Sequence, residues 1–101
     1  MSLYITQLIY IKPGEESVFN EFEDLAIPLI NNYNGKLLLR VRPEETAFIE
    51  RTIESPHEIH LIEFTSETDF QNFMNDPERK KFLFLKEKAV ASVLLIKGVK
   101  I

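Results

Sequence analysis

The segment His57–Phe64, which reads HEIHLIEF, constrains the fold more than any other part of this chain. Its apolar residues occupy both sets of alternating positions, so both faces of an extended segment here are apolar. A strand of this kind is covered on both sides and therefore lies inside a sheet. The segment also carries His60 and Glu63, two ionisable side chains in a place that should be shielded from water. We therefore expect an inner strand with polar chemistry attached to it.

Composition limits the class of protein. A chain of 101 residues with 45% hydrophobic and 28% charged residues is typical of one soluble globular domain, here residues 1–101. No apolar run approaches the roughly 20 residues that cross a bilayer, and no signal peptide is recognisable, so a cytoplasmic location and no membrane partner are expected. The net charge of −4 argues against a nucleic-acid partner. The absence of cysteine excludes disulfides and thiolate sites.

Hydrophobic spacing predicts the elements in the order strand, helix, strand, strand, helix, strand. Apolar residues at helical spacing occupy residues 15–33 and 66–89. In the second region Ser66 is the expected N-cap, and Asp76-Pro77 is expected to restart a helix with Asp76 as its N-cap. Pro28 predicts a kink or break in the helix at residues 15–33. Its acidic residues, Glu23 among them, are expected largely on the outer side. In the second strand we expect Leu37, Leu39 and Val41 on one face and Lys36, Leu38, Arg40 and Arg42 on the other. The strands are expected at residues 3–11, 36–42, 57–64 and 93–99.

This order consists of two strand–helix–strand halves. Right-handed crossovers leave a gap between the two strands of each half, and interleaving the halves fills it. The result is an α+β fold, a ferredoxin-like βαββαβ arrangement with a four-stranded antiparallel sheet and both helices on one face. The first and third strands are then central, as their two apolar faces require.

The other face of such a sheet is left bare. Strands one, three and four nevertheless supply apolar side chains to both faces, and a monomer rarely exposes an apolar patch of more than a few hundred Å². We therefore expect a homodimer that packs sheet against sheet across roughly 1,500 Å² or more and forms a dimeric α/β barrel.

Three segments resemble one family. They are residues 28–40, with the sequence PLINNYNGKLLLR; Pro56–His57, followed by the apolar strand and Glu63-Phe64-Thr65-Ser66; and Asp76-Pro77-Glu78. In this order and spacing they resemble the domain of unknown function 1330 family, within the dimeric α/β-barrel superfamily. The resemblance covers nearly the whole chain and implies the fold and the dimer. The wider superfamily includes cofactor-free monooxygenases, haem-degrading enzymes and lactone isomerases.

Glu63 and His60 are the candidate catalytic residues. A desolvated carboxylate on a central strand has the character of a general base, with Arg40 or Lys86 as its cationic partner. The two residues have different parity and should point to opposite faces, and we predict that Glu63 faces the helix-side pocket. The alternative for Glu63 is a structural ion pair or an exposed strand end, and the alternative for His60 is a neutral, fully hydrogen-bonded core residue.

Arg40, Gln7, Tyr33 and Lys86 are the candidate substrate-binding residues of a pocket between helices and sheet; the alternative is that they satisfy one another or a buried water. The basic residues of the second helical region suit either a solvated face or an anionic ligand. His57 and His60 are three residues apart on a strand and point to opposite faces, so we predict no metal site. No cofactor motif is recognisable.

Two functions remain open. The first is a small-molecule pocket in a cofactor-independent enzyme, monooxygenase- or isomerase-like by analogy with the superfamily. The second is a non-enzymatic dimeric module with a binding or structural role.

Overall fold

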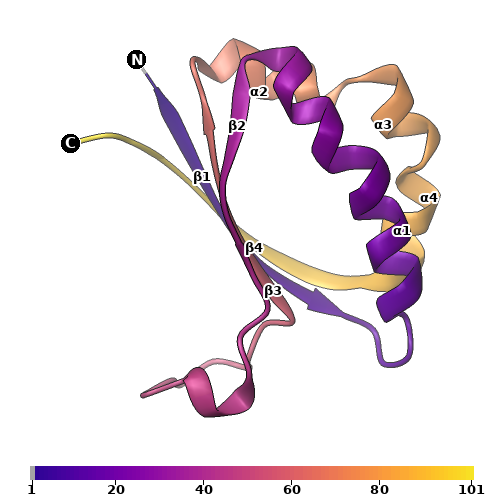
Figure 1. Ribbon diagram of the computed structural model, residues 1–101, viewed down its shortest axis with the longest axis vertical. Helices are drawn as coiled ribbons and strands as arrows, with labels where there is room; N and C mark the ends of the chain where they lie inside the picture. Colours follow the sequence, from indigo (N-terminus) through magenta and orange to yellow (C-terminus); the bar gives the residue numbers. More distant parts are fainter. Residues whose placement is uncertain (1) are drawn as a thin grey trace.

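Four strands form one antiparallel sheet in the order β2-β3-β1-β4 in the computed structural model, which describes residues 2–101 (Figure 1). The two strands with apolar residues on both faces, β1 and β3, are central. This confirms the predicted ferredoxin-like order. The strands are β1 Leu3–Ile11, β2 Gly35–Val41, β3 Glu58–Phe64 and β4 Val90–Val99.

All the α-helices lie on one side of this sheet, as predicted (Figure 1). The predicted break at Pro28 is also confirmed: the first helix changes to a 3₁₀ helix, η1, at Ile27, because proline lacks the N–H that an α-helix needs at that point. Asn34, with φ of 55°, ends it. The elements are α1 Glu16–Ala26, η1 Ile27–Tyr33, α2 Glu67–Met74, α3 Pro77–Lys81 and α4 Leu83–Ala89.

Side-chain caps fix where α2 and α3 begin. The Ser66 hydroxyl accepts a hydrogen bond of 3.1 Å from the backbone N–H of Asp69, as the sequence predicted. Asp76 caps α3 through a 2.8 Å hydrogen bond from the backbone N–H of Arg79, with Pro77 in the first turn. The second cap starts a short helix that carries Arg79 back toward the sheet, where its side chain is buried.

Alternation along β3 separates two faces. Its even-numbered residues, from Glu58 to Phe64, are buried under the helices, and the odd-numbered ones are partly exposed on the other face. The covered face packs Phe64 against Phe70 and Phe73 of α2, with Ile5 of β1 in the same cluster. Farther along the covered face of β3, beyond Ile62, the buried side chains are polar: His60 and Glu58.

A β-bulge in β2 overturns one prediction. The register with β3 shifts between Leu37 and Leu39, so Leu37 pairs with Ile62 but Arg40 pairs with His60. The extra residue reverses the alternation. Leu39 and Val41 therefore lie on the open face, and Arg40 and Arg42 turn toward the helices, where both bond to Glu58. The predicted division of β2 into an apolar and a charged face was wrong beyond the bulge.

The face away from the helices is open and apolar. Leu39 of β2 and Leu94 and Ile96 of β4 are each about half exposed there. The segment between β2 and β3, with the 3₁₀ turn η2 Glu45–Ala47, projects as an arm on this same side (Figure 1). The Tyr10 hydroxyl holds the arm through a 2.8 Å bond to the carbonyl of Glu54. Across residues 2–101, no helix has the length and apolar character to cross a membrane.

Candidate functional site

Glu58, the first residue of β3, is the centre of a buried charge network. Its side chain has no exposed surface, and it accepts hydrogen bonds from Arg40 Nε at 2.9 Å and Arg42 Nε at 2.7 Å. Burial alone would raise the pKa of Glu58, but the hydrogen bonds from His60, Arg40 and Arg42 outweigh it and bring this pKa down to about 2. Glu58 is therefore an ionised carboxylate at any pH where the protein would work.

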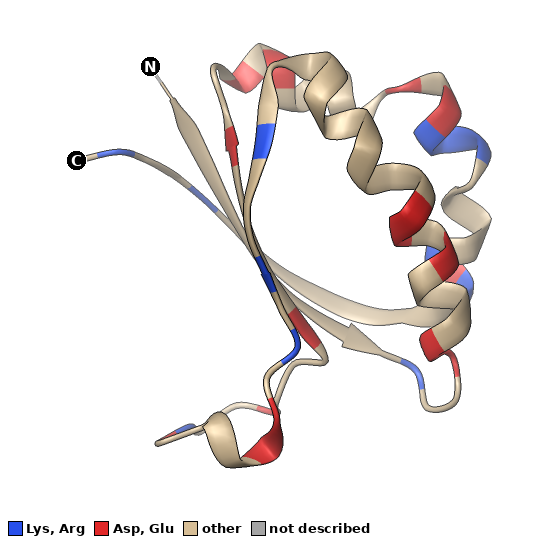
Figure 2. Cartoon of the chain, in the orientation of Figure 1, with Lys and Arg blue, Asp and Glu red and all other residues tan. Residues whose placement is uncertain are grey.

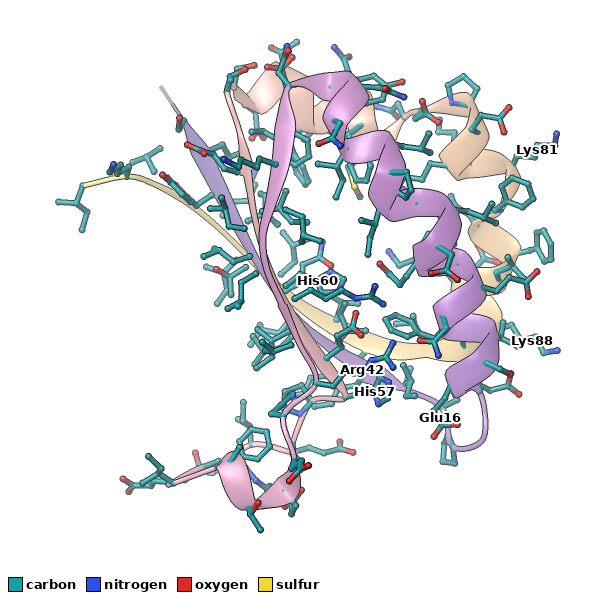
Figure 3. The ribbon with its side chains drawn as sticks, in the orientation of Figure 1. Glu16, Arg42, His57, His60, Lys81 and Lys88 are labelled. Atoms are coloured by element: carbon teal, nitrogen blue, oxygen red, sulfur yellow. The ribbon has the colours of Figure 1, made fainter. Side chains whose placement is uncertain are left out.

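His60 is held by Glu58. The ring is only 2% exposed and points from β3 toward the helices, with Nε2 in contact with Glu58 Oε2 (Figure 3). Because Glu58 is ionised and can only accept, Nε2 carries the proton of the neutral imidazole. Within residues 2–101 no hydrogen bond reaches the other nitrogen, Nδ1. This leaves Nδ1 with a lone pair, the arrangement of a general base fixed by a carboxylate.

Glu23 approaches the same imidazole from α1, so its predicted place on the outer side was wrong. It is 8% exposed. Burial raises the pKa of Glu23; nearby Glu58 raises it further, while His60, Arg40 and Lys86 act in the opposite direction. One ligand atom from each of Glu23, Glu58 and His60 lies within 4.8 Å of the others. Two carboxyl groups with pKa values shifted in opposite directions thus flank one imidazole.

A cavity of about 120 Å³ opens between these groups and the helices. Its polar lining consists of one residue from each of five elements: Gln7 of β1, Glu23 of α1, His60 of β3, Arg79 of α3 and Lys86 of α4. Figure 2 shows acidic positions along α1 and basic positions on α3 and α4, the elements that bring Glu23, Arg79 and Lys86 to this space. The remaining wall is largely apolar, from Ile9, Phe19, Phe22, Ala26, Ile27, Ile30, Ile62, Phe73, Met74, Val90, Val93 and Leu95.

Glu23, Glu58 and His60 are residue types that ligate metals, and the sequence prediction of no metal site considered only His57 and His60. The chemistry of the cluster suits a proton better than a cation. Each Glu58 oxygen already accepts from an arginine, so a metal would have to displace a guanidinium from a carboxylate. His57 stands apart, with its ring edge-on to Phe19 at 5.7 Å and a buried Nε2 that has no hydrogen-bond partner within residues 2–101.

The prediction that Glu63 faces the helices was wrong. It lies on the open face, opposite Tyr4 and Lys36 in the two neighbouring strands. The pKa of Tyr4 is raised by partial burial and by this carboxylate. His60 and Glu63 do point to opposite faces as expected, but the residue that reaches the cavity is His60.

The predicted binding residues divide into two groups. Gln7 and Lys86 line the cavity. Arg40 is not among the residues that line the cavity; it is opposite His60 in the neighbouring strand, and its guanidinium bonds to Glu58. Tyr33 is at the far end of the helical layer, where its hydroxyl donates to the carboxylate of Asp76 and its ring meets Phe73 at 6.3 Å.

Sequence reasoning missed Glu58, Arg42 and the inward position of Glu23, although signals for all three were present. It considered Arg79 only as one of the basic residues of the second helical region. Glu58 and His60 are two apart on one strand, and Arg40 and Arg42 are two apart on its neighbour, so opposite charges repeat with the period of one sheet face. Glu23 follows Phe19 by four residues and precedes Ala26 by three, which places it on the buried stripe of α1.

The family model described as "Domain of unknown function (DUF1330)" matches residues 4–99. The chain belongs to this family. No curated protein matches the sequence. The fold of this chain also occurs in solved structures of low sequence identity. At such identity the likeness establishes the fold and nothing about function.

A protein of unknown function from Rhodopseudomonas palustris is 16% identical with a TM-score of 0.83, covering 99% of this chain and 82% of that one. A dimeric protein of unknown function with a ferredoxin-like fold from Bacteroides fragilis is 12% identical with a TM-score of 0.70, covering 96% and 94%. A putative antibiotic biosynthesis monooxygenase from Chloroflexus aurantiacus is 10% identical with a TM-score of 0.67, covering 100% and 94%.

Proposed function

We propose that this member of the family is an enzyme that moves a proton on a small molecule, using only its own side chains. The observation that carries the proposal is the pair of buried carboxyl groups with opposite pKa shifts beside one imidazole. Environments that push the pKa values of neighbouring groups apart are how one site holds an acid and a base together. Structural ion pairs also shift pKa values, but they do not leave a cavity open beside an imidazole nitrogen without a partner.

The roles follow from the geometry. His60 Nδ1 takes a proton from a carbon next to a carbonyl group, and the electron pair of the broken C–H bond moves onto the carbonyl oxygen. Glu58 keeps the imidazole in the required tautomer and stabilises the imidazolium that forms. Glu23, with its raised pKa, donates a proton to the developing enolate, and both groups return to their starting states by exchange with water. Loss of that proton is the first step of an isomerisation and also of a cofactor-free oxygenation.

The test is deuterium incorporation from D₂O, followed by proton NMR, into small enolisable ketones, aldehydes, oxo acids and oxo-acid amides. The wild-type protein should accelerate exchange for at least one class, and Glu23→Gln and His60→Gln should each lower the rate by about 100-fold or more. Glu63→Gln, on the opposite face, should leave the rate unchanged. The proposal would be refuted if the wild-type protein exchanged no class of compound faster than buffer does. It would also be refuted if Glu23→Gln exchanged deuterium at the wild-type rate.

We also propose that the open sheet face joins two copies of this chain. Aliphatic side chains dominate that face, and the arm between β2 and β3 extends on the same side with Ile49 and Ile53 exposed. An arm with apolar side chains in water gains stability only when a partner covers it. Sedimentation velocity at micromolar concentration should give a dimer, and a monomer at that concentration would contradict the proposal.

A further inference from the structure

Arg79 is a buried cation whose guanidinium has no carboxylate bonded to it within residues 2–101. Its side chain is 7% exposed, and its guanidinium lies over Phe73 at 5.3 Å and Phe22 at 6.0 Å. It has five N–H donors, yet the one side-chain hydrogen bond that the structure gives it goes from Nη1 to the carbonyl of Met74, at 3.3 Å. A buried charge with unused donors is costly unless something answers it, and this one lines the cavity.

Lys86 places a second cation beside it. It lines the same cavity from α4 and has no salt bridge among the described residues. Burial lowers the pKa of Lys86 and proximity to Arg79 lowers it further, while Glu23 opposes both. Two carboxyl groups act on this pair, Glu23 on both cations and Asp76 on Arg79. Asp76 already accepts from the Tyr33 hydroxyl and the backbone N–H of Arg79, and within residues 2–101 neither carboxyl group is bonded to the guanidinium of Arg79 or the ammonium group of Lys86. Both cations therefore keep N–H donors for an anionic ligand.

The position of these cations indicates how a ligand would enter. Arg79 and Lys86, together with Met74 and Val90, line both the inner cavity and a wider hollow outside it. They stand where the hollow meets the cavity, between the α2–α3 corner and α4. Glu87 also lines the outer hollow. An anionic group held where the hollow meets the cavity lies beside both cations, and an attached apolar body then extends inward toward His60.

The inner volume sets the size of that body. About 120 Å³ is close to the volume of an apolar cavity that accepts benzene, about 150 Å³. Phe19, Phe22, Ile62 and Phe73 supply apolar walls. A ligand with about six to nine non-hydrogen atoms fits this space, provided that its charged end stays between the cations.

We infer that the cavity takes a small organic carboxylate, its anionic group held by Arg79 and Lys86 and its apolar body directed toward His60. Among enolisable compounds this selects short oxo acids. The inference rests on the proposed function for the reacting centre, but it concerns binding, which is measured separately.

The test compares α-ketoisovalerate with its neutral amide, and benzoate with benzamide, by isothermal titration calorimetry and NMR. Each pair has the same size and differs in charge. The anions should bind at least about tenfold more tightly than the amides, because a desolvated cation pair discriminates strongly by charge. Lys86→Met should abolish most of this preference. Lys88→Met is the matched control, because Lys88 is on the same helix, is exposed and points away from the cavity (Figure 3); it should change binding by less than about twofold.

Three results separate the two proposals. Equal binding of anion and amide, including binding of neither, would overturn the carboxylate inference. An equal effect of Lys86→Met and Lys88→Met would also overturn it. Glu23→Gln should retain anion binding; if it does so while no compound exchanges deuterium in wild type, the ligand class stands and the proton-transfer function fails.

Discussion

The two faces of this sheet each depart from the usual distribution of polar and apolar side chains. The face under the helices, which normally holds only apolar side chains, carries Glu58, His60 and Arg40. The face without helices carries a field of aliphatic residues that includes Leu94 and Ile96. Burying charge costs stability, and so does exposing apolar surface. Each face therefore indicates a need beyond the folding of one chain: the covered face for a ligand, the open face for a partner.

The two faces should differ most in the loss of stability when one carboxylate is removed from each, Glu58 from the covered face and Glu63 from the open face. Glu58→Gln leaves the cations of Arg40 and Arg42 without their buried counter-charge, so we expect a loss of about 3 kcal/mol in the free energy of unfolding at pH 7. Glu63→Gln removes a carboxylate from the opposite face of the sheet and should change the free energy of unfolding by no more than about 0.5 kcal/mol. Urea denaturation measures the free energy of unfolding of both variants. Equal losses in the two variants would contradict the predicted difference between the faces.

The stabilisation that Glu58 provides should disappear in acid. The pKa of Glu58 is lowered from 4.5 to about 2, so its contribution to stability is complete above pH 4.5 and disappears as the pH falls toward 2. The difference between wild type and Glu58→Gln should shrink over that range. A constant difference from pH 7 to pH 2 would show that Glu58 is not the ionised centre of the network.

A charge on the open face should act on assembly instead of folding. Ile96→Lys places an ammonium group on the open face proposed as the interface, and we expect the dimer dissociation constant to rise by about 100-fold. Phe84→Lys is the control, since Phe84 is an exposed apolar residue on α4, away from the sheet. Sedimentation equilibrium distinguishes the two variants. The same dissociation constant for both would place the interface elsewhere.

The smallest expected effect has the opposite sign. The pKa of Glu23 is raised by burial, so its favourable contribution exists at low pH and is lost as the pH rises through the folded-state pKa. At pH 7 the wild type bears a cost that Glu23→Gln lacks, and we expect the variant to be more stable by about 1 kcal/mol. Glu21→Gln, exposed on the same helix, should be neutral. Thermal unfolding at pH 7 tests this, and destabilisation by Glu23→Gln would contradict it.

The sequence was sufficient for the fold because its signals are repeated. Two strand–helix–strand halves, the two-faced strands β1 and β3, the helix break at Pro28 and the cap at Ser66 all agree with one topology. The bulge in β2 has no such signal: no glycine or proline marks Leu38, and a run of leucines fits either register. One extra residue there turned Arg40 and Arg42 inward and altered the whole site.

The site was harder to predict than the fold because it depends on which side chains point toward the helices. That direction follows from the sequence only after the register of the strands is known. His60 could be placed on a central strand, but which face the helices cover could not be read from HEIHLIEF, where both faces contain an ionisable residue. Arg79 looked like part of a solvated basic helix. Its burial depends on the short α3 helix, whose cap at Asp76 was predicted but whose direction relative to the sheet was not.

An acid and a base in this cavity require the two carboxyl groups beside His60 to have different pKa values. Carbon-detected NMR of protein labelled with ¹³C at the glutamate carboxyl positions, assigned with Glu23→Gln and Glu58→Gln, measures both midpoints in one sample. We predict a midpoint for Glu58 near 2 and a midpoint for Glu23 above its ordinary value of 4.5. Two midpoints that both lie near 4.5 would contradict the assignment of an acid and a base to this cavity.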